Sequence, residues 1–184
     1  GKADAFVFNK GVLKNIVKKN PDLTILETPV ALVEVAAAFN KKETELRSQI
    51  NYALAELENN GTLEEMKAKW IYSEYETVPE MTEIENDGKN GKLVMGTCAQ
   101  FEPYTFVYNN EITGFDIELA GRIGEILGKQ IKIVDMSFES LIPALQSGKI
   151  DFALANFNVT KERKKYINYS TPYVTNDISE LVKK

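Results

Sequence analysis

The chain of 184 residues contains no histidine and a single cysteine. Without histidine, the usual zinc sites, Ser-His catalytic triads and histidine general bases are excluded. The lone cysteine, Cys98, has no partner in the sequence for an internal disulfide or a thiolate metal cluster. These absences weigh against an enzyme, and they predict a protein without a metal or other cofactor.

Long apolar runs are also missing, and no segment of the sequence is long enough to span a bilayer. The sequence shows no signal peptide, because Gly1 and Lys2 lead directly into a strand-like segment. We therefore expect that any export signal was removed or lay upstream. The formal net charge of −5 disfavours binding to nucleic acid and to anionic membranes.

Hydrophobic spacing divides the first 70 residues into short strands and helices. Strands are predicted at residues 3–8, 23–26 and 33–39, and helices at residues 11–19, 43–58 and 62–70. Thr62 followed by Glu65 has the spacing of a capping box, which predicts that Thr62 caps the last of these helices. Residues 71–92 contain several glutamates with little periodicity and end in turn-forming residues, so they are the predicted linker.

After the linker, strands and helices alternate along the sequence. Strands are predicted at residues 93–97, 131–134 and 150–155, and helices at residues 115–127, from Ser137 to Gly148, and after Thr160. Such alternation predicts an α/β fold with parallel strands and right-handed crossovers. Ligands of these sheets bind at the carboxyl ends of the strands.

Several stretches resemble extracellular solute-binding proteins of ABC importers. Residues 97–104 (TCAQFEPY) and 112–117 (ITGFDI) are similar to the amino-terminal opening of that family. Residues 59–70 (NNGTLEEMKAKW) are similar to its carboxyl end. The strongest resemblance lies at residues 151–173 (DFALANFNVTKERKKYINYSTPY), which are similar to the branch that binds polar amino acids. Since the ending precedes the opening here, the resemblance implies a permuted or spliced order.

The resemblance implies a three-layer α/β/α lobe of a type II periplasmic-binding-protein fold, permuted, with a truncated second lobe. Residues 28–70 would be the carboxyl-terminal part of lobe one and residues 93–172 its amino-terminal part, with the linker 71–92 between them. Residues 1–27 would be a remnant of lobe two next to the hinge, and residues 173–184 the hinge and an edge strand of lobe two. The middle of lobe two has no counterpart. A slice across two tandem domains and a deliberately trimmed permutant both explain that loss.

The resemblance further implies a site for an amino acid or a related carboxylate. Arg163 is expected in the first turn of the helix that Thr160 opens, where the helix amino terminus and the planar guanidinium both favour a carboxylate. The alternative is that Arg163 belongs to a solvated basic face. Phe101 and Phe138 match positions at which the family encloses the ligand's aliphatic part between aromatic rings, and plain core packing is the alternative for both.

Four positions depart from the family pattern. Cys98 stands where an aspartate usually lies near the ligand, and a small buried side chain is the alternative interpretation. Asn156 and Asn158 replace the small residue and the hydroxyl that commonly contact the ligand. Asn9 matches the aspartate of the second lobe that pairs with the ligand's α-amine. Because asparagine provides no charge pairing, the ligand is expected to be an atypical amino acid or another small carboxylate.

The function implied by the resemblance is extracytoplasmic binding of an amino acid and its delivery to the membrane permease of an ABC importer, without catalysis. One alternative is an engineered or excised lobe that folds but binds little. Another is an enzyme on the same fold, such as a carboxylate dehydratase, for which Glu102 is the candidate acid or base. The truncated lobe would expose strand edges at residues 3–8 and 178–183, so a strand-exchanged homodimer is expected.

Overall fold

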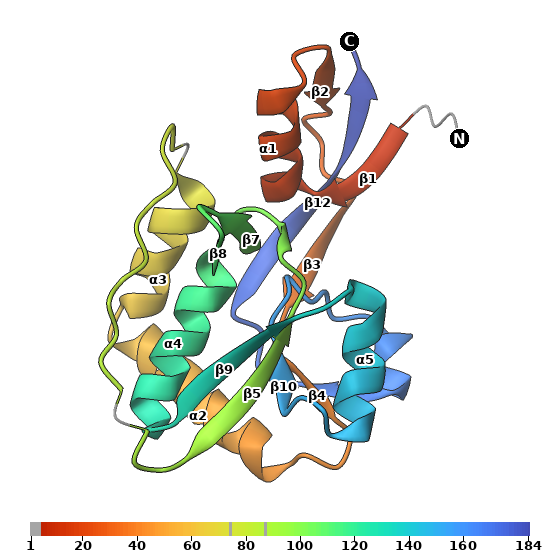
Figure 1. Ribbon diagram of the computed structural model, residues 1–184. Coiled ribbons are helices and arrows are strands. Elements are labelled where there is room, and N and C mark those ends of the chain that lie inside the picture. Colours follow the sequence, from red (N-terminus) through yellow and green to blue (C-terminus); the bar gives the residue numbers. More distant parts are fainter. Residues whose placement is uncertain (1–4, 74, 87) are drawn as a thin grey trace.

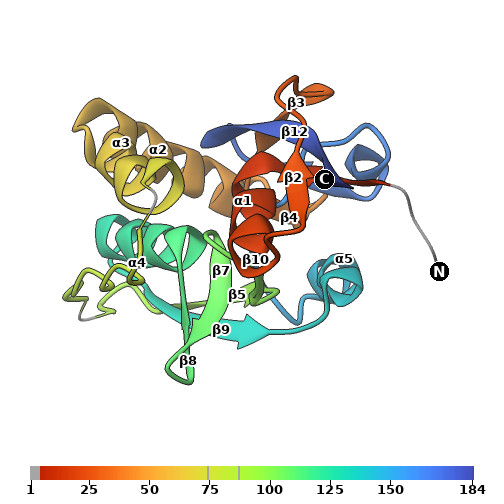
Figure 2. The ribbon, with the colours of Figure 1, turned by 90° about the horizontal axis from the view of Figure 1, so that it is seen from above.

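The computed structural model describes residues 5–73, 75–86 and 88–184. The start of the first predicted strand, at residues 3 and 4, and the linker residues Glu74 and Asp87 lie outside the described residues. Within the described part of the chain, the strands form a large sheet, a small sheet and a short meander (Figure 1). Viewed from above, the small sheet and its helix lie over the middle of the large sheet (Figure 2).

The large sheet has the strand order β11-β4-β10-β5-β9. Its strands are β11 (Ile167–Tyr169), β4 (Ala38–Asn40), β10 (Phe152–Ala153), β5 (Lys92–Thr97) and β9 (Gln130–Asp135). The predicted parallel pairing is confirmed for β10, β5 and β9, whereas β4 pairs antiparallel with both of its neighbours. The sheet therefore joins one strand from before the linker to four strands from after it.

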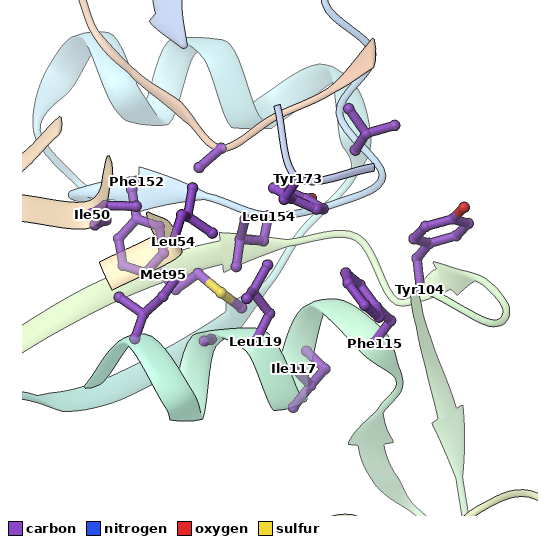
Figure 3. Packing of buried hydrophobic residues seen from close by; sticks show 14 of the residues in the cluster. Ile50, Leu54, Met95, Tyr104, Phe115, Ile117, Leu119, Phe152, Leu154 and Tyr173 are labelled. Carbon is purple, nitrogen blue, oxygen red and sulfur yellow. The ribbon is translucent and has the colours of Figure 1, made fainter. Parts of the chain in front are cut away.

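Helices cover both faces of the large sheet. On one face lie α2 (Glu45–Asn59), α3 (Thr62–Lys67) and α4 (Phe115–Leu127), and on the other face lies α5 (Phe138–Ser147) (Figure 1). The core on the first face joins Ile50 and Leu54 to Met95 and Leu119 (Figure 3). These apolar side chains are buried because each helix turns its periodic face toward the sheet. No helix within the described residues is long and apolar enough to cross a membrane.

The small sheet is built around β12 (Val174–Lys183). On one side, β12 pairs antiparallel with β1 (Ala5–Asn9), and on the other side it pairs with β3 (Ala31–Val35) and β2 (Leu23–Ile25). Helix α1 (Lys10–Lys19) packs against this sheet. The expectation that residues 178–183 form an exposed edge is therefore wrong, because both edges of β12 are paired.

The predicted strand at residues 33–39 is two strands in different sheets. β3 ends at Val35 in the small sheet, and β4 begins at Ala38 in the large one. Between them, the backbone N–H of Ala36 donates to the Phe157 carbonyl at 3.2 Å, and that of Ala37 donates to Ser170 Oγ at 3.0 Å. From Val35 to Phe39 every residue is apolar and buried, so the composition at the break gives no sign of the change of sheet.

The predicted capping box at Thr62 is also wrong. The residue that caps α3 is Gly61, which has a left-handed φ of 84°, and Thr62 is already helical. The backbone N–H of Thr62 is satisfied by Asn60 Oδ1 at 3.0 Å. Beyond α3, the chain continues as the π-helical turn η1 (Ala68–Tyr72).

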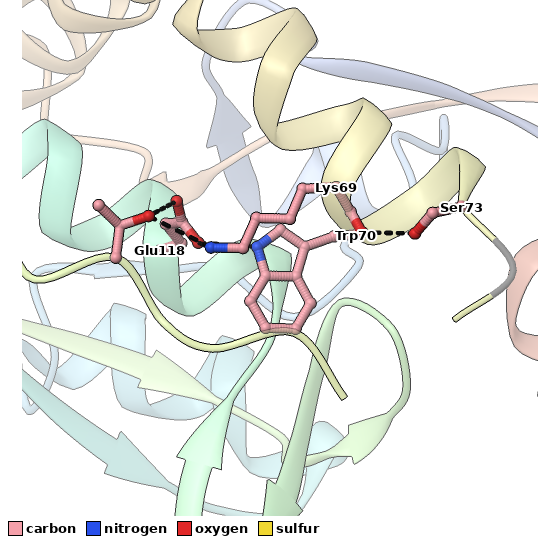
Figure 4. A network of polar contacts seen from close by, with 5 residues as sticks. Lys69, Trp70, Ser73 and Glu118 are labelled. Atoms are coloured by element: carbon pink, nitrogen blue, oxygen red, sulfur yellow. Dashed lines mark hydrogen bonds and ion pairs between the residues drawn. The ribbon is translucent and has the colours of Figure 1, made fainter. Parts of the chain in front are cut away.

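A polar cluster ties η1 and the linker to α4 (Figure 4). The carboxylate of Glu118 accepts hydrogen bonds from Lys69 Nζ at 2.7 Å and from Trp70 Nε1 at 2.8 Å. Thr82 Oγ1, in the linker, donates to the same carboxylate at 2.6 Å. Burial acts to raise the pKa of Glu118, but these donors together outweigh it and lower that pKa. Thr82 therefore attaches the linker to α4, and with it to the lobe formed by the large sheet and its helices, called the large lobe below.

The meander consists of β6 (Gln100–Phe101), β7 (Thr105–Tyr108) and β8 (Glu111–Thr113). It leads into α4 through Gly114, which has a φ of 120°. A Cβ at this position would lie 2.5 Å from the Tyr104 carbonyl oxygen, so only glycine fits. This close approach fixes the turn after Phe101 against the first residues of α4, as shown by the 2.8 Å hydrogen bond from the Asp116 N–H to the Tyr104 carbonyl.

Candidate ligand-binding site

Three phenylalanine rings form a continuous aromatic wall, made of Phe101, Phe138 and Phe157. The ring centroids of Phe101 and Phe138 are 5.8 Å apart with planes at 87°, and those of Phe138 and Phe157 are 4.9 Å apart. Rings at these separations are in direct contact. The structure thus brings the two predicted aromatic residues together, but as neighbours in one wall and not as opposite sides of a slot.

Arg163 lies against this wall. Its guanidinium carbon is 4.9 Å from the centroid of Phe138 and 5.0 Å from that of Phe157, which is cation–π geometry. The Nη1 atom donates to the Asn158 carbonyl at 3.0 Å. The Arg163 side chain also acts on the Tyr169 hydroxyl. Because a guanidinium has five N–H donors, others remain for a carboxylate.

The helix expected after Thr160 is wrong. Only one 3-10 turn forms, η2 (Arg163–Lys165), before the chain enters β11. The residue that caps η2 is Glu162, and Thr160 Oγ1 accepts from the Arg163 N–H at 3.1 Å just before that turn. A single turn has too few aligned peptides to give a helix dipole of useful size, so the electrostatic attraction for an anion here rests on the guanidinium.

The two asparagines near Arg163 face different surroundings. The Asn158 carbonyl accepts from both Arg163 and the Tyr169 hydroxyl, the latter at 3.2 Å, while its own Oδ1 is buried without a hydrogen-bond partner. Asn156 has a left-handed φ of 48°, which asparagine tolerates. Its side chain accepts from Asn176 Nδ2 at 3.0 Å. Asn158 therefore belongs to the surroundings of Arg163, and Asn156 belongs to a buried network.

Asn9 caps α1 and is 1% exposed. Its Oδ1 accepts from the N–H groups of Gly11 at 2.8 Å and Val12 at 3.3 Å. Both acceptor positions of the amide oxygen are thus occupied by the helix, and no acceptor remains for a ligand amine. The Nδ2 atom makes no hydrogen bond of good geometry, but the Asn9 side chain lies close enough to the Tyr104 hydroxyl to act to lower its pKa.

A buried network beside the wall was not anticipated from the sequence. Asp116, on the first turn of α4, accepts from the Tyr173 hydroxyl at 2.9 Å and from the Asn156 N–H at 2.7 Å. Asn176, on β12, accepts from the Tyr104 hydroxyl at 2.5 Å and donates to Asn156. Burial raises the pKa of Asp116 to about 7 despite its two donors. A carboxylate between the apolar neighbours Phe115 and Ile117 was the sequence signal for this site.

Cys98 is 2% exposed and packs with the side chains under α5. Burial, and next the charge of Asp135, raise the pKa of the thiol, with a smaller contribution from Glu139 in the same direction; the backbone of Phe138 acts to lower it. Cys98 therefore lies next to Phe138 as a neutral thiol, in a region where Asp135 and Glu139 supply negative charge.

A cavity of about 380 Å³ lies on the other side of the Phe101 turn, between α1 and the meander. Gln100 and Glu102 line it, whereas Phe101 does not, because successive side chains along a strand point to opposite faces. Glu102 is engaged there: it pairs with Lys19 at 3.3 Å and accepts from the Tyr75 hydroxyl at 3.3 Å. Burial, then the Glu102 charge, raise the pKa of Tyr75.

The family model of bacterial extracellular solute-binding proteins, family 3, matches residues 93–184. The chain belongs to this family. The resemblance seen in residues 97–173 is thereby confirmed, as is the α/β/α lobe typical of family 3. The earlier stretch at residues 59–70 lies outside the matched range.

Similar proteins include the arginine-binding extracellular protein ArtP of Bacillus subtilis, 42% identical over 84 residues, which cover 46% of this chain and 33% of ArtP. The ABC transporter arginine-binding protein 1 of Escherichia coli is 34% identical over 94 residues, covering 50% of this chain and 39% of that protein. Among solved structures, the arginine-bound form of domain 1 from TmArgBP is 37% identical, with a TM-score of 0.45, covering 55% of this chain and 87% of that one. The chain spans well under half the length of these two curated relatives.

Proposed function

We propose that the chain binds an amino acid outside the cytoplasm and presents it to the membrane permease of an ABC importer, without catalysing a reaction. The observation that supports this most directly is Arg163, held on the aromatic wall with donors to spare, in a chain of family 3. The ligand's carboxylate would take the free N–H groups of Arg163. Its side chain would lie along Phe101 and Phe138.

Two carboxylates near the wall favour a cationic side chain on that amino acid. Asp135 and Glu139 both act on the Cys98 thiol, so they place negative charge near Phe138, on which the positive guanidinium of Arg163 also lies. Several similar proteins are named for binding arginine or histidine. Arginine is therefore the first ligand to test, in place of the atypical amino acid expected from the asparagine substitutions alone.

Isothermal titration calorimetry with L-arginine, L-histidine and L-cystine tests this proposal. We expect a dissociation constant on the order of millimolar, about −4 kcal/mol, because tight small-molecule sites enclose most of the ligand and Asn9 offers no acceptor from the small sheet. The Arg163→Lys variant is the matched control, since it keeps the charge without the planar fork. Absence of binding by all three amino acids at millimolar concentration contradicts the proposal.

We further propose that the chain order is spliced relative to the family, with residues 28–70 and 93–172 completing one lobe. This division is supported by β4, which comes from the first segment and lies between β10 and β11 of the second. The Glu118 cluster supports it as well, because it joins η1 to α4 across the linker.

A second copy of the chain is the proposed partner of the small sheet. Within the described residues, β1 pairs only with β12, so its other edge is open, and Phe6 and Val7 on it are each 49% exposed. An open, apolar edge strand favours pairing with another strand. Antiparallel β1–β1 contact, or exchange of β1, would give a symmetric homodimer.

A further inference from the structure

We infer that Phe8 competes with the ligand for Phe101, because its ring stacks on the side chain along which the proposed function places the ligand. This inference rests on the proposed function and adds to it a residue that lowers the affinity for the ligand. Phe8 belongs to β1, in the small sheet, whereas the aromatic wall belongs to the large lobe. Ligand binding and contact between the two parts of the molecule therefore compete for one surface.

The geometry around Phe101 supports this competition. The rings of Phe8 and Phe101 are stacked, with centroids 5.7 Å apart and planes at 27°. Phe138 meets the same ring at 87°, so Phe101 has an aromatic neighbour from each part of the molecule. The half-buried Phe8 is held in place by its strand pairing with Ser179 and by Phe6, which stacks on it at 5.6 Å.

A charged contact reinforces the same closed arrangement. Lys19, at the end of α1, pairs with Glu102, the residue after Phe101. The small sheet thus contacts Phe101 through an aromatic ring, and α1 contacts the next residue, Glu102, through an ion pair. A ligand that displaces the Phe8 ring must replace a stacked contact, while the exposed ion pair adds little resistance.

The shape of the displaced group points to the class of ligand. A phenyl ring is best replaced by another planar group. Aromatic rings and guanidinium groups both stack on the face of a phenylalanine. The wall already accepts such a group, because the Arg163 guanidinium lies over Phe138 and Phe157. Amino acids with a planar side-chain group, such as arginine, are therefore preferred over lysine, which has the same charge without the plane.

Calorimetric titration of the parent chain, Phe8→Ala and Val7→Ala with L-arginine and with L-lysine tests the inference. We expect Phe8→Ala to bind L-arginine about tenfold more tightly than the parent, since the ligand no longer has to break an aromatic stack. Val7→Ala is the matched control, because it shortens an exposed apolar side chain that points to the opposite face of the same strand; its affinity should stay within about twofold. All three proteins should prefer L-arginine to L-lysine.

Equal affinity of the parent and Phe8→Ala for L-arginine overturns the inference and leaves the proposed function standing. Lack of binding by every variant overturns both. Circular dichroism melting checks that Phe8→Ala is folded. If Phe8→Ala is not folded, Phe8→Leu takes its place, because leucine keeps apolar bulk without a planar ring. The affinity of Phe8→Leu for L-arginine should lie between those of the parent and of the alanine variant. Nuclear Overhauser contacts between the Phe8 and Phe101 rings should disappear at saturating L-arginine, and their persistence at saturation also overturns the inference.

Discussion

Asp116 should make the stability of the chain depend on pH in a direction opposite to that of most carboxylates. Its pKa is raised by burial from 3.8 to about 7. Between these two values the folded chain binds the proton that the unfolded chain has lost, so the free energy of unfolding falls as pH rises. Below about pH 4 both states are protonated and no penalty exists; above about pH 7 the penalty is complete.

Asp116→Asn isolates this effect. The amide is a neutral analogue of the protonated acid: its oxygen accepts from the Asn156 N–H, and its NH₂ group donates to the Tyr173 hydroxyl in place of the present Tyr173 donation. A pKa of about 7 in place of 3.8 corresponds to a free energy on the order of 4 kcal/mol. The variant should therefore match the parent near pH 4 and exceed its stability by up to about that amount near pH 8.

Urea unfolding measures this difference, with the fluorescence of Trp70 as the probe because that side chain is fully buried. Asp22→Asn is the matched control: it removes an exposed carboxyl, and its offset from the parent should stay within about 0.5 kcal/mol at every pH. If the offset between Asp116→Asn and the parent were the same at about pH 4 and about pH 8, burial would not be controlling the protonation of Asp116.

Other parts of the structure give further expected results. Native proteolysis within the linker, residues 71–92, should leave the two fragments associated in gel filtration, because Lys69 and Trp70 remain bonded to Glu118; fragments that elute separately contradict the spliced lobe. Arg163→Lys should weaken L-arginine binding by roughly 1–3 kcal/mol through loss of the fork, and unchanged affinity in calorimetry removes Arg163 from the site. The same variant should also lose about 1 kcal/mol of stability in urea unfolding, since it gives up the bond to Asn158 and two ring contacts; equal stability counts against that packing. Light scattering after gel filtration should detect a dimer, and a monomer at all concentrations rules out pairing through β1.

Long periodic elements were predictable from the sequence. Helix α4 has the predicted bounds, and α5 lies between the predicted Ser137 cap and Gly148. The signals there are local: apolar spacing and a glycine that ends the helix. The prediction of a single strand at residues 33–39 was wrong because a buried segment is apolar whether it stays in one sheet or passes into another. The prediction of a helix after Thr160 was wrong for a related reason, since a residue suited to start a helix does not determine how far the helix continues.

The candidate site was predictable only in part. The resemblance pointed to Phe101, Phe138 and Arg163, and these lie together in the structure. Asn9 was expected to face the ligand, yet its oxygen caps α1, because the position that opens a helix satisfies its own backbone first. The network around Asp116 depends on Asn176, which is distant in sequence and reaches the site only through the pairing of β12. Local sequence patterns do not predict such contacts between residues that are distant in sequence.

Strand β12 belongs to the small sheet and also contacts the large sheet's lobe, and its contacts indicate where the chain would have to bend for Phe8 to leave Phe101. Asn176 fixes the first half of β12 to the large lobe through the Tyr104 hydroxyl and the Asn156 side chain. The second half, from Ile178 onward, carries β1 and therefore Phe8. Separation of Phe8 from Phe101 consequently requires bending beyond Asn176, near Ile178, where the strand pairs with β1 on one side and β3 on the other. In such a bend we expect the buried network to hold the first half of β12 in place, so that Arg163 and the aromatic wall keep their geometry when the Phe8 ring leaves.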